Sequence, residues 1–211
     1  MRLRVLLSIG ISLVALGVPV AVAGATPTTV RSGMEIGIDD TLLTTNNCTL
    51  GAVISRTKAL TAGHCGAVGR PVRDRHGTRI GTVTANRVAR DLDIAVIRLA
   101  PRAVIRVDDV NWNPRFFRGQ PVTKVGVATG FGKGKVTDPS LVKRTSAGFS
   151  LAPPFVTVHD SYSIQTSLHS QLGDSGAGVR DTRGQVVGIL SSGTADGTIV
   201  VPLSKVPRSL R

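Results

Sequence analysis

Short β-type runs separated by turn residues make up most of the chain after residue 45, and no long segment shows helical periodicity. The clearest runs cover residues 49–55, 58–65, 79–88, 93–100, 121–129, 145–152, 155–160, 163–169, 185–192 and 197–204. Runs at this spacing are typical of antiparallel sheets that close into barrels or sandwiches. The sequence therefore predicts an all-β protein built from two compact antiparallel units.

The strand pattern lapses between residues 107 and 120, where "VDDVNWNPRFFRGQ" contains a proline and a glycine as breakers. We predict a linker over residues 111–119. It divides an N-terminal unit, residues 26–110, from a C-terminal unit, residues 120–211.

Residues 1–25 have the composition of a secretory signal peptide. Two arginines precede an apolar run that ends near Val22, and the small residues that follow allow cleavage at Ala23 or Ala25. An uncleaved membrane anchor is the alternative, because a run of about 18 apolar residues is marginally long enough to span a bilayer. We expect cleavage, a secreted protein, and no membrane span in what remains.

The chain is strongly basic, with a formal net charge of +13 that falls to +11 when the two signal-peptide arginines are removed. Such a charge attracts a protein to anionic cell-surface polymers, but as a field effect and not as a site. The densest basic cluster, residues 70–79, contains no aromatic residue on which a base could stack. We therefore predict no specific nucleic-acid partner, and we expect a monomer.

Cys48 and Cys65 are the two cysteines of the chain. In an exported protein they are most simply interpreted as one disulfide, although two free thiols are the alternative. In the chain-entropy model, closing a loop of this length stabilises the fold by about 3 kcal/mol. No cysteine and histidine cluster has zinc-ligand spacing, and we predict no metal and no cofactor.

Three residues supply the types needed for nucleophilic hydrolysis: a nucleophile, an imidazole base and an orienting carboxylate. Ser175 lies in the glycine-rich turn "GDSGAG", His64 ends a strand, and Asp93 begins an apolar strand. Gly173 could add its N–H to that of Ser175 as an oxyanion hole. Asp91 competes with Asp93, but the apolar residues after Asp93 would bury it. The order His, Asp, Ser differs from that of the α/β-hydrolases.

The motifs "LTAGHC" (60–65), "DIAV" (93–96) and "GDSGAG" (173–178) resemble those of the trypsin/chymotrypsin-like serine peptidases, especially the small bacterial secreted members. The resemblance implies two antiparallel six-stranded β-barrels with the active site in the cleft between them. It also implies a catalytic triad of His64, Asp93 and Ser175. The oxyanion hole would be formed by Gly173 and Ser175, and the disulfide Cys48–Cys65 would brace the histidine loop.

The resemblance also assigns substrate-binding residues. His169, six positions before the nucleophile, would lie at the floor of the primary pocket, and Gly193 would keep the pocket mouth open. Ser191 would help to bury Asp93. Asp196 could enter from the next loop and select basic substrates, or simply be a turn residue before a glycine. We predict no cleavage preference.

Asp174 has a structural role by the same resemblance, as one half of a buried ion pair that shapes the oxyanion turn. Better-known relatives supply the cation as a new N-terminus, and some bacterial relatives use an internal arginine. The sequence marks no single partner. A zymogen step therefore stays open at this level.

The function predicted from these features is a secreted serine endopeptidase that acts on proteins or peptides through an acyl-enzyme intermediate. Two alternatives remain. One is a catalytically inactive relative that serves as a basic secreted binding protein, and the other is an esterase on the same fold.

Overall fold

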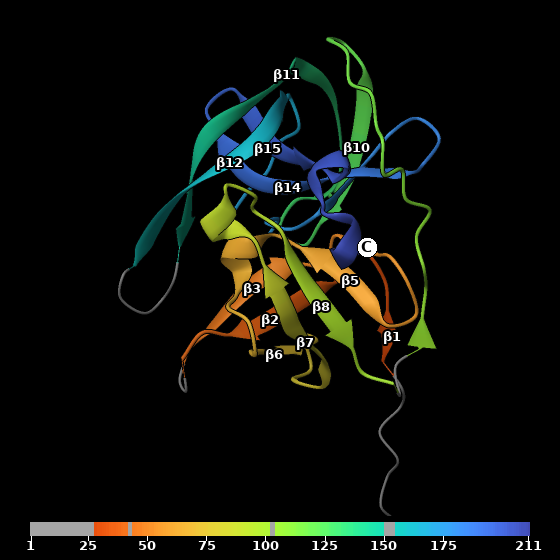
Figure 1. Ribbon diagram of the computed structural model, residues 1–211, viewed down its shortest axis with the longest axis vertical. Coiled ribbons are helices and arrows are strands. Elements are labelled where there is room, and N and C mark those ends of the chain that lie inside the picture. The colour runs from red at the N-terminus through yellow and green to blue at the C-terminus, as the bar shows by residue number, and fades with distance from the viewer. Residues whose placement is uncertain (1–27, 42–43, 102–103, 150–154) are drawn as a thin grey trace, which may run out of the picture.

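The computed structural model of the 211-residue chain describes residues 28–41, 44–101, 104–149 and 155–211 (Figure 1). The predicted signal peptide lies outside the described residues. Within them the regular structure consists of strands β1–β15 and the short 3₁₀ helices η1–η4, so the predicted all-β class is confirmed. None of the helices in these ranges is long and apolar enough to cross a membrane.

The N-terminal unit is one curled antiparallel sheet with the strand order β3-β2-β6-β7-β8-β5-β4. Its strands are β2 (Glu35–Asp39), β3 (Thr45–Thr49), β4 (Ala52–Val53), β5 (Lys58–Thr61), β6 (Pro71–Arg73), β7 (Arg79–Asn86) and β8 (Ala95–Leu99).

The two edge strands of this sheet, β3 and β4, are separated in the chain only by Leu50 and Gly51. The two edges therefore meet, and β3 and β4 act as two parts of one interrupted strand. With β3 and β4 counted as one strand, the sheet has the six strands predicted; the structure divides them into seven among the described residues, because the two halves of this strand pair with different neighbours.

The C-terminal unit is a closed six-stranded barrel, as predicted. Around it run β10 (Pro121–Gly126), β11 (Gly130–Phe149), β12 (Val156–Thr166), β15 (Gly197–Pro202), β14 (Val186–Thr194) and β13 (Gly178–Arg180).

Strands β11 and β12 form a long hairpin, which Figure 1 shows extending from the barrel toward the N-terminal sheet. The sequence predicted two separate strands over 155–160 and 163–169, but the structure has a single β12. The polar residues between the two runs do not form a turn, because they continue to pair with β11: Ser161 lies opposite Arg144 and Tyr162 opposite Lys143.

Aliphatic side chains fill both units and the interface between them. One buried cluster lies in the N-terminal sheet and a second in the barrel. A third cluster joins the two units; its members include Leu60, Ile94, Val186, Val201 and Leu203. Burial of the apolar side chains of this third cluster holds the two units against each other.

The chain end belongs to this interface. The helices η3 (Leu203–Lys205) and η4 (Arg208–Leu210) follow the last barrel strand, and Lys58 Nζ of the N-terminal sheet donates a 2.8 Å hydrogen bond to the carbonyl oxygen of Arg211. The last residues of the predicted C-terminal unit thus contact the N-terminal one.

The connection between the units runs from β9 (Val104–Ile105), which pairs with β1 (Thr29–Val30), to β10. The predicted linker lies within it. Asp108, just before the linker, accepts hydrogen bonds from Val53 N (2.7 Å) on one side and from Arg180 Nη2 (2.5 Å) on the other. This carboxylate ties the connection to both units.

Candidate active site

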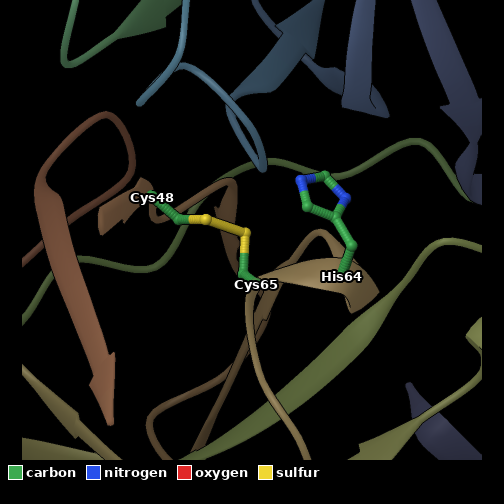
Figure 2. A group of neighbouring side chains, drawn as sticks. All are labelled: Cys48, His64 and Cys65. Atoms are coloured by element: carbon green, nitrogen blue, oxygen red, sulfur yellow. A yellow bond between two sulfur atoms is a disulfide. The ribbon is translucent and has the colours of Figure 1, made fainter. Parts of the chain in front are cut away.

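His64 lies in η1 (Gly63–Cys65), and the disulfide Cys48–Cys65 joins this turn to β3 (Figure 2). The predicted disulfide is confirmed, with the two Cα atoms 6.2 Å apart. Gly63 allows close packing before the histidine, since a Cβ there would lie 3.0 Å from the backbone nitrogen of Ile94. The backbone of His64 is therefore held by a covalent link on one side and by the β8 segment on the other.

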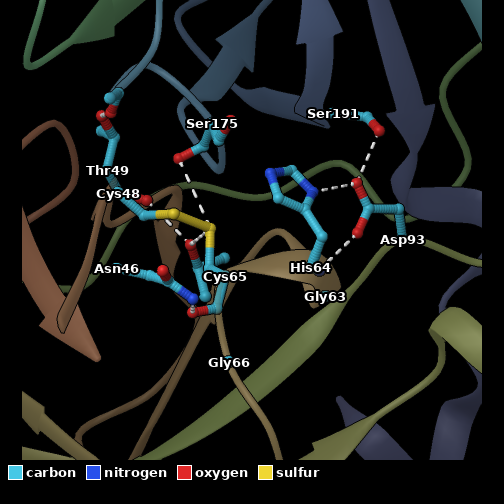
Figure 3. The surroundings of a disulfide bond; sticks show 12 residues. Asn46, Cys48, Thr49, Gly63, His64, Cys65, Gly66, Asp93, Ser175 and Ser191 are labelled. Atoms are coloured by element: carbon cyan, nitrogen blue, oxygen red, sulfur yellow. Dashed lines mark hydrogen bonds and ion pairs between the residues drawn. A yellow bond between two sulfur atoms is a disulfide. The ribbon is translucent and has the colours of Figure 1, made fainter. Parts of the chain in front are cut away.

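Asp93 is completely buried and faces His64 (Figure 3). Its Oδ2 lies 2.8 Å from His64 Nδ1, and its Oδ1 accepts a 2.8 Å hydrogen bond from the backbone N–H of His64. Ser191 Oγ donates a 2.5 Å hydrogen bond to Oδ2. Asp91 is half exposed and pairs instead with Lys143 at 2.8 Å. Of the two candidate carboxylates, Asp93 is the one placed to orient the imidazole.

These contacts shift the protonation of both groups. Burial alone lowers the pKa of His64, but the charge of Asp93 and its hydrogen bond outweigh that effect, so the pKa lies above 6.5. Burial raises the pKa of Asp93. The neighbouring imidazoles of His64 and His159 lower it by more than burial raises it, so the net pKa is strongly depressed. Asp93 is thus ionised throughout the neutral range, and His64 is a stronger base than a free imidazole.

Ser175 lies on a turn between two glycines in left-handed conformation, Gly173 (φ +102°) and Gly176 (φ +88°). The N–H groups of Asp174, Gly176 and Ala177 are all hydrogen-bonded within the protein. Those of Gly173 and Ser175 donate to no group in the described part of the chain. Two free N–H groups beside a serine hydroxyl are the donors that a developing oxyanion requires.

Thr49, next to the disulfide, fastens this turn to the N-terminal sheet. Its backbone N–H donates to the carbonyl of Ser175 and its hydroxyl to the carbonyl of Gly173, both at 2.8 Å. The Ser175 carbonyl also lies 3.9 Å from Cys65 Sγ, beside His64 (Figure 3). Ser175 Oγ makes no hydrogen bond to His64 within the described residues; such bonds are often long without substrate.

The buried partner of Asp174 is Lys124. Its ammonium lies 2.8 Å from Asp174 Oδ2, and both side chains are completely buried. Asp174 also accepts hydrogen bonds from Thr129 Oγ1 (2.6 Å) and from the N–H groups of Ala128 (2.8 Å) and Gln171 (3.2 Å). Burial raises the pKa of Asp174, but the hydrogen bonds from Lys124 and Thr129 outweigh it and the pKa is lowered. The cation that pairs with Asp174 of the serine turn is therefore an internal lysine of β10.

His159 of β12 is the neighbour that the sequence analysis missed. Its Nε2 lies 3.2 Å from Asp93 Oδ2, and its ring stacks on that of His64 with centroids 5.2 Å apart and planes at 25°. Nothing in the local sequence marks this residue, because the contact depends on the length and curvature of the β11–β12 hairpin.

Two groups of side chains in the described part of the chain have the composition of a metal site. His64, Asp93 and His159 have ligand atoms within 4.8 Å of one another, as do Cys48, His64 and Cys65. The cysteines are joined in a disulfide and offer no thiolate. In the other group, both imidazoles approach the same carboxylate oxygen rather than a common empty point. The arrangement suits a carboxylate between two histidines better than a metal ion.

A cavity of about 360 Å³ lies beside Ser175, and its lining includes Ser170, Leu190, Ser192 and Gly193. No charged side chain of the described chain lines it. His169 and Asp196 line an adjoining depression instead. The structure thus brings Gly193 to the predicted pocket but does not place His169 at its floor, so a substrate contact by His169 stays a prediction.

Residues 14–189 match the sequence model of a family described as "Trypsin-like peptidase domain". The chain belongs to the trypsin-like peptidase family. It is thereby placed among the serine endopeptidases, as its motifs predicted. A search of curated proteins found no significant match.

Solved structures of bacterial proteases share this fold. Cellulomonas bogoriensis chymotrypsin is 21% identical, with a TM-score of 0.60 over 86% of this chain and 95% of that one. The Nocardiopsis protease is 22% identical, with a TM-score of 0.59 over 83% and 92% of the two chains. Thermobifida fusca protease A is 20% identical, with a TM-score of 0.57 over 83% and 91%. The chain thus shares the fold of these bacterial proteases over more than four fifths of its length.

Proposed function

We propose that this trypsin-like chain is a secreted serine endopeptidase that uses Ser175, His64 and Asp93 as its triad. The observation that carries the proposal is the buried Asp93 bound to His64 Nδ1, beside a serine turn with two free N–H groups. In the reaction, Ser175 Oγ attacks the substrate carbonyl while His64 Nε2 takes its proton. The N–H groups of Gly173 and Ser175 stabilise the oxyanion, and the peptide C–N bond then breaks as His64 gives its proton to the departing amine. In the second half of the reaction His64 takes a proton from water, which attacks the acyl-enzyme, and the proton returns to Ser175 Oγ as the acid product leaves.

The proposed domain division follows the sequence: a leader over 1–25, an N-terminal barrel over 26–110, a linker over 111–119 and a C-terminal barrel over 120–211. Secretion is supported by the disulfide, which persists in oxidising compartments. Lys124 removes the need for a new N-terminus at Asp174. We therefore propose that the serine turn is formed without a zymogen cleavage.

Active-site labelling tests the proposed function. The secreted protein should gain the mass of one fluorophosphonate adduct, and a Ser175→Ala variant should gain none. The unlabelled mass also reports the position of leader cleavage and the state of the cysteines. If the folded wild-type protein forms no adduct, the catalytic proposal fails, and the inactive binding protein becomes the better description. Comparing ester with peptide substrates separates an esterase from a peptidase.

The pH profile of the reaction is a second prediction. His64 must be neutral to accept the proton of Ser175, and its pKa lies above 6.5 because of Asp93. The specificity constant kcat/KM should therefore rise with pH, with a midpoint above the value of a free imidazole. Rates measured with an uncharged peptide substrate between about pH 5 and about pH 9 test this. A flat profile would exclude His64 as the base.

The strongly basic charge of the protein supports a second interaction, which is not catalytic, with anionic polymers. Arg87, Arg90 and Lys205 line a cavity of about 380 Å³ beside Asp91. We propose that such surfaces hold the monomeric protein loosely to anionic polymers of the cell surface. Retention on an anionic polymer that does not weaken with salt would contradict this electrostatic origin.

A further inference from the structure

His159 makes two different contacts with the proposed triad. Its Nε2 approaches Asp93 Oδ2 to 3.2 Å, and its ring covers one face of the His64 imidazole. Only 9% of the surface of His159 is exposed. A buried imidazole in contact with both the orienting carboxylate and the base can influence each of them.

The alignment of His159 shows that it competes for the carboxylate. Asp93 Oδ2 already accepts hydrogen bonds from His64 Nδ1 and Ser191 Oγ, which fill its two lone pairs. Neither ring nitrogen of His159 makes a well-aligned hydrogen bond among the described residues. Its contact with Oδ2 is therefore mainly electrostatic, and it draws on the same oxygen that holds His64.

The other charged groups nearby point to partners of their own. On the segment before Asp93, Asp91 pairs with Lys143 of β11. On β12, Asp160 accepts a 2.8 Å hydrogen bond from Thr145 Oγ1. Lys205 lies over the ring of Tyr162 at 5.4 Å. Among the described residues, the titratable groups in contact with His159 are therefore Asp93 and His64.

We propose that His159 is a positioning residue: by sharing Asp93 Oδ2 and covering the His64 ring, it limits how strongly Asp93 holds a proton on His64. The inference rests on the proposed function, in which His64 is the base. An imidazole N–H held 3.2 Å from Oδ2, even without ideal hydrogen-bond alignment, stabilises the charge of the carboxylate and so weakens the attraction of Asp93 for the His64 imidazolium. Without that donor, His64 binds its proton more tightly and is neutral over a narrower range of pH.

The test replaces His159 and follows His64 directly. In His159→Phe the ring remains but the N–H is lost, whereas His159→Gln keeps an N–H donor. The chain has four histidines, so ¹⁵N-imidazole NMR can follow each titration in turn. We expect the His64 midpoint to move to higher pH in the Phe variant and to stay near the wild-type value in the Gln variant. The exposed His76→Phe is the matched control and should leave the midpoint unchanged.

The rate of fluorophosphonate labelling gives the second measurement. We expect the Phe variant to lose about tenfold in rate near pH 6 and less than about twofold near pH 9, because the base recovers once it is deprotonated. An equal loss at both pH values, or an unchanged His64 midpoint, would overturn the inference and leave His159 a packing residue. If the Phe variant does not fold, His159→Leu carries the same expectation with a smaller side chain.

The two measurements separate this inference from the proposed function. A wild-type protein that is not labelled contradicts the function, but the NMR midpoints still show whether His159 acts on His64. A labelled wild type whose His159→Phe variant has the same profile contradicts only the role of His159.

Discussion

Lys124→Met should lower the free energy of unfolding by about 3 kcal/mol and greatly slow the labelling of Ser175. The physical reason is that methionine fills the space of the lysine but removes the charge that faces Asp174 across 2.8 Å in a completely buried site. Removing one partner of a buried ion pair costs about 3–5 kcal/mol, because the remaining charge is left uncompensated. We expect the lower end, since Asp174 keeps its hydrogen bonds from Thr129 and from backbone N–H groups.

The effect on labelling follows from the position of Asp174 in the chain. It lies between Gly173 and Ser175, the two residues whose N–H groups form the proposed oxyanion hole. With its charge left uncompensated, Asp174 no longer fixes the turn in one position, and a small shift of the turn takes these N–H groups out of alignment; each lost donor costs about 10²–10³ in rate.

Urea denaturation and labelling kinetics measure the two effects separately. Lys135→Met is the matched control, because this lysine is exposed on the neighbouring strand β11. Asp174→Asn combined with Lys124→Met removes both charges and should recover part of the lost stability. Wild-type stability and labelling in Lys124→Met alone would show that the turn does not depend on this ion pair.

Asp93→Asn should reduce kcat by about 10⁴ while the protein remains folded, which is the magnitude known for this exchange in triads of the family. The asparagine NH₂ would face His64 Nδ1 and favour the tautomer that carries its proton on Nε2. That nitrogen then cannot accept the proton of Ser175. Thermal unfolding, measured in parallel, should show a folded variant, because the amide has nearly the shape of the carboxylate.

Asp91→Asn provides the matched control for this experiment. Asp91 lies two residues earlier, has a left-handed backbone (φ 54°) that asparagine tolerates well, and pairs with Lys143 on the surface. Its loss should leave kcat near the wild-type value. Near-wild-type turnover in Asp93→Asn together with a loss in Asp91→Asn would mean that the carboxylates have been assigned in the wrong order.

Local patterns predicted most of the strands well. The alternating run 79–88 became β7, the apolar run 93–100 became β8, and the runs 185–192 and 197–204 became β14 and β15. The short strands β1, β2, β3, β6, β9 and β13 were not predicted, because runs of two to five residues carry too little periodicity to be distinguished from loops.

The sequence by itself determined the parts of this protein that are encoded by neighbours along the chain. The glycines around Ser175 allow its turn, the apolar residues after Asp93 bury it, and Cys65 directly follows His64. Three short motifs were therefore enough to predict the family. The resemblance to that family in turn predicted the disulfide and the closed C-terminal barrel.

Only the tertiary structure decided which distant residues complete the site. Lys124 reaches Asp174 across 50 positions, Thr49 holds the Ser175 turn across more than 120, and His159 reaches Asp93 through the β11–β12 hairpin. Each contact depends on strand register and sheet curvature, which arise from packing over the whole barrel and leave no mark in the local sequence. In a protein with many scattered lysines and arginines, the one buried beneath the serine turn is identified by its position in the fold.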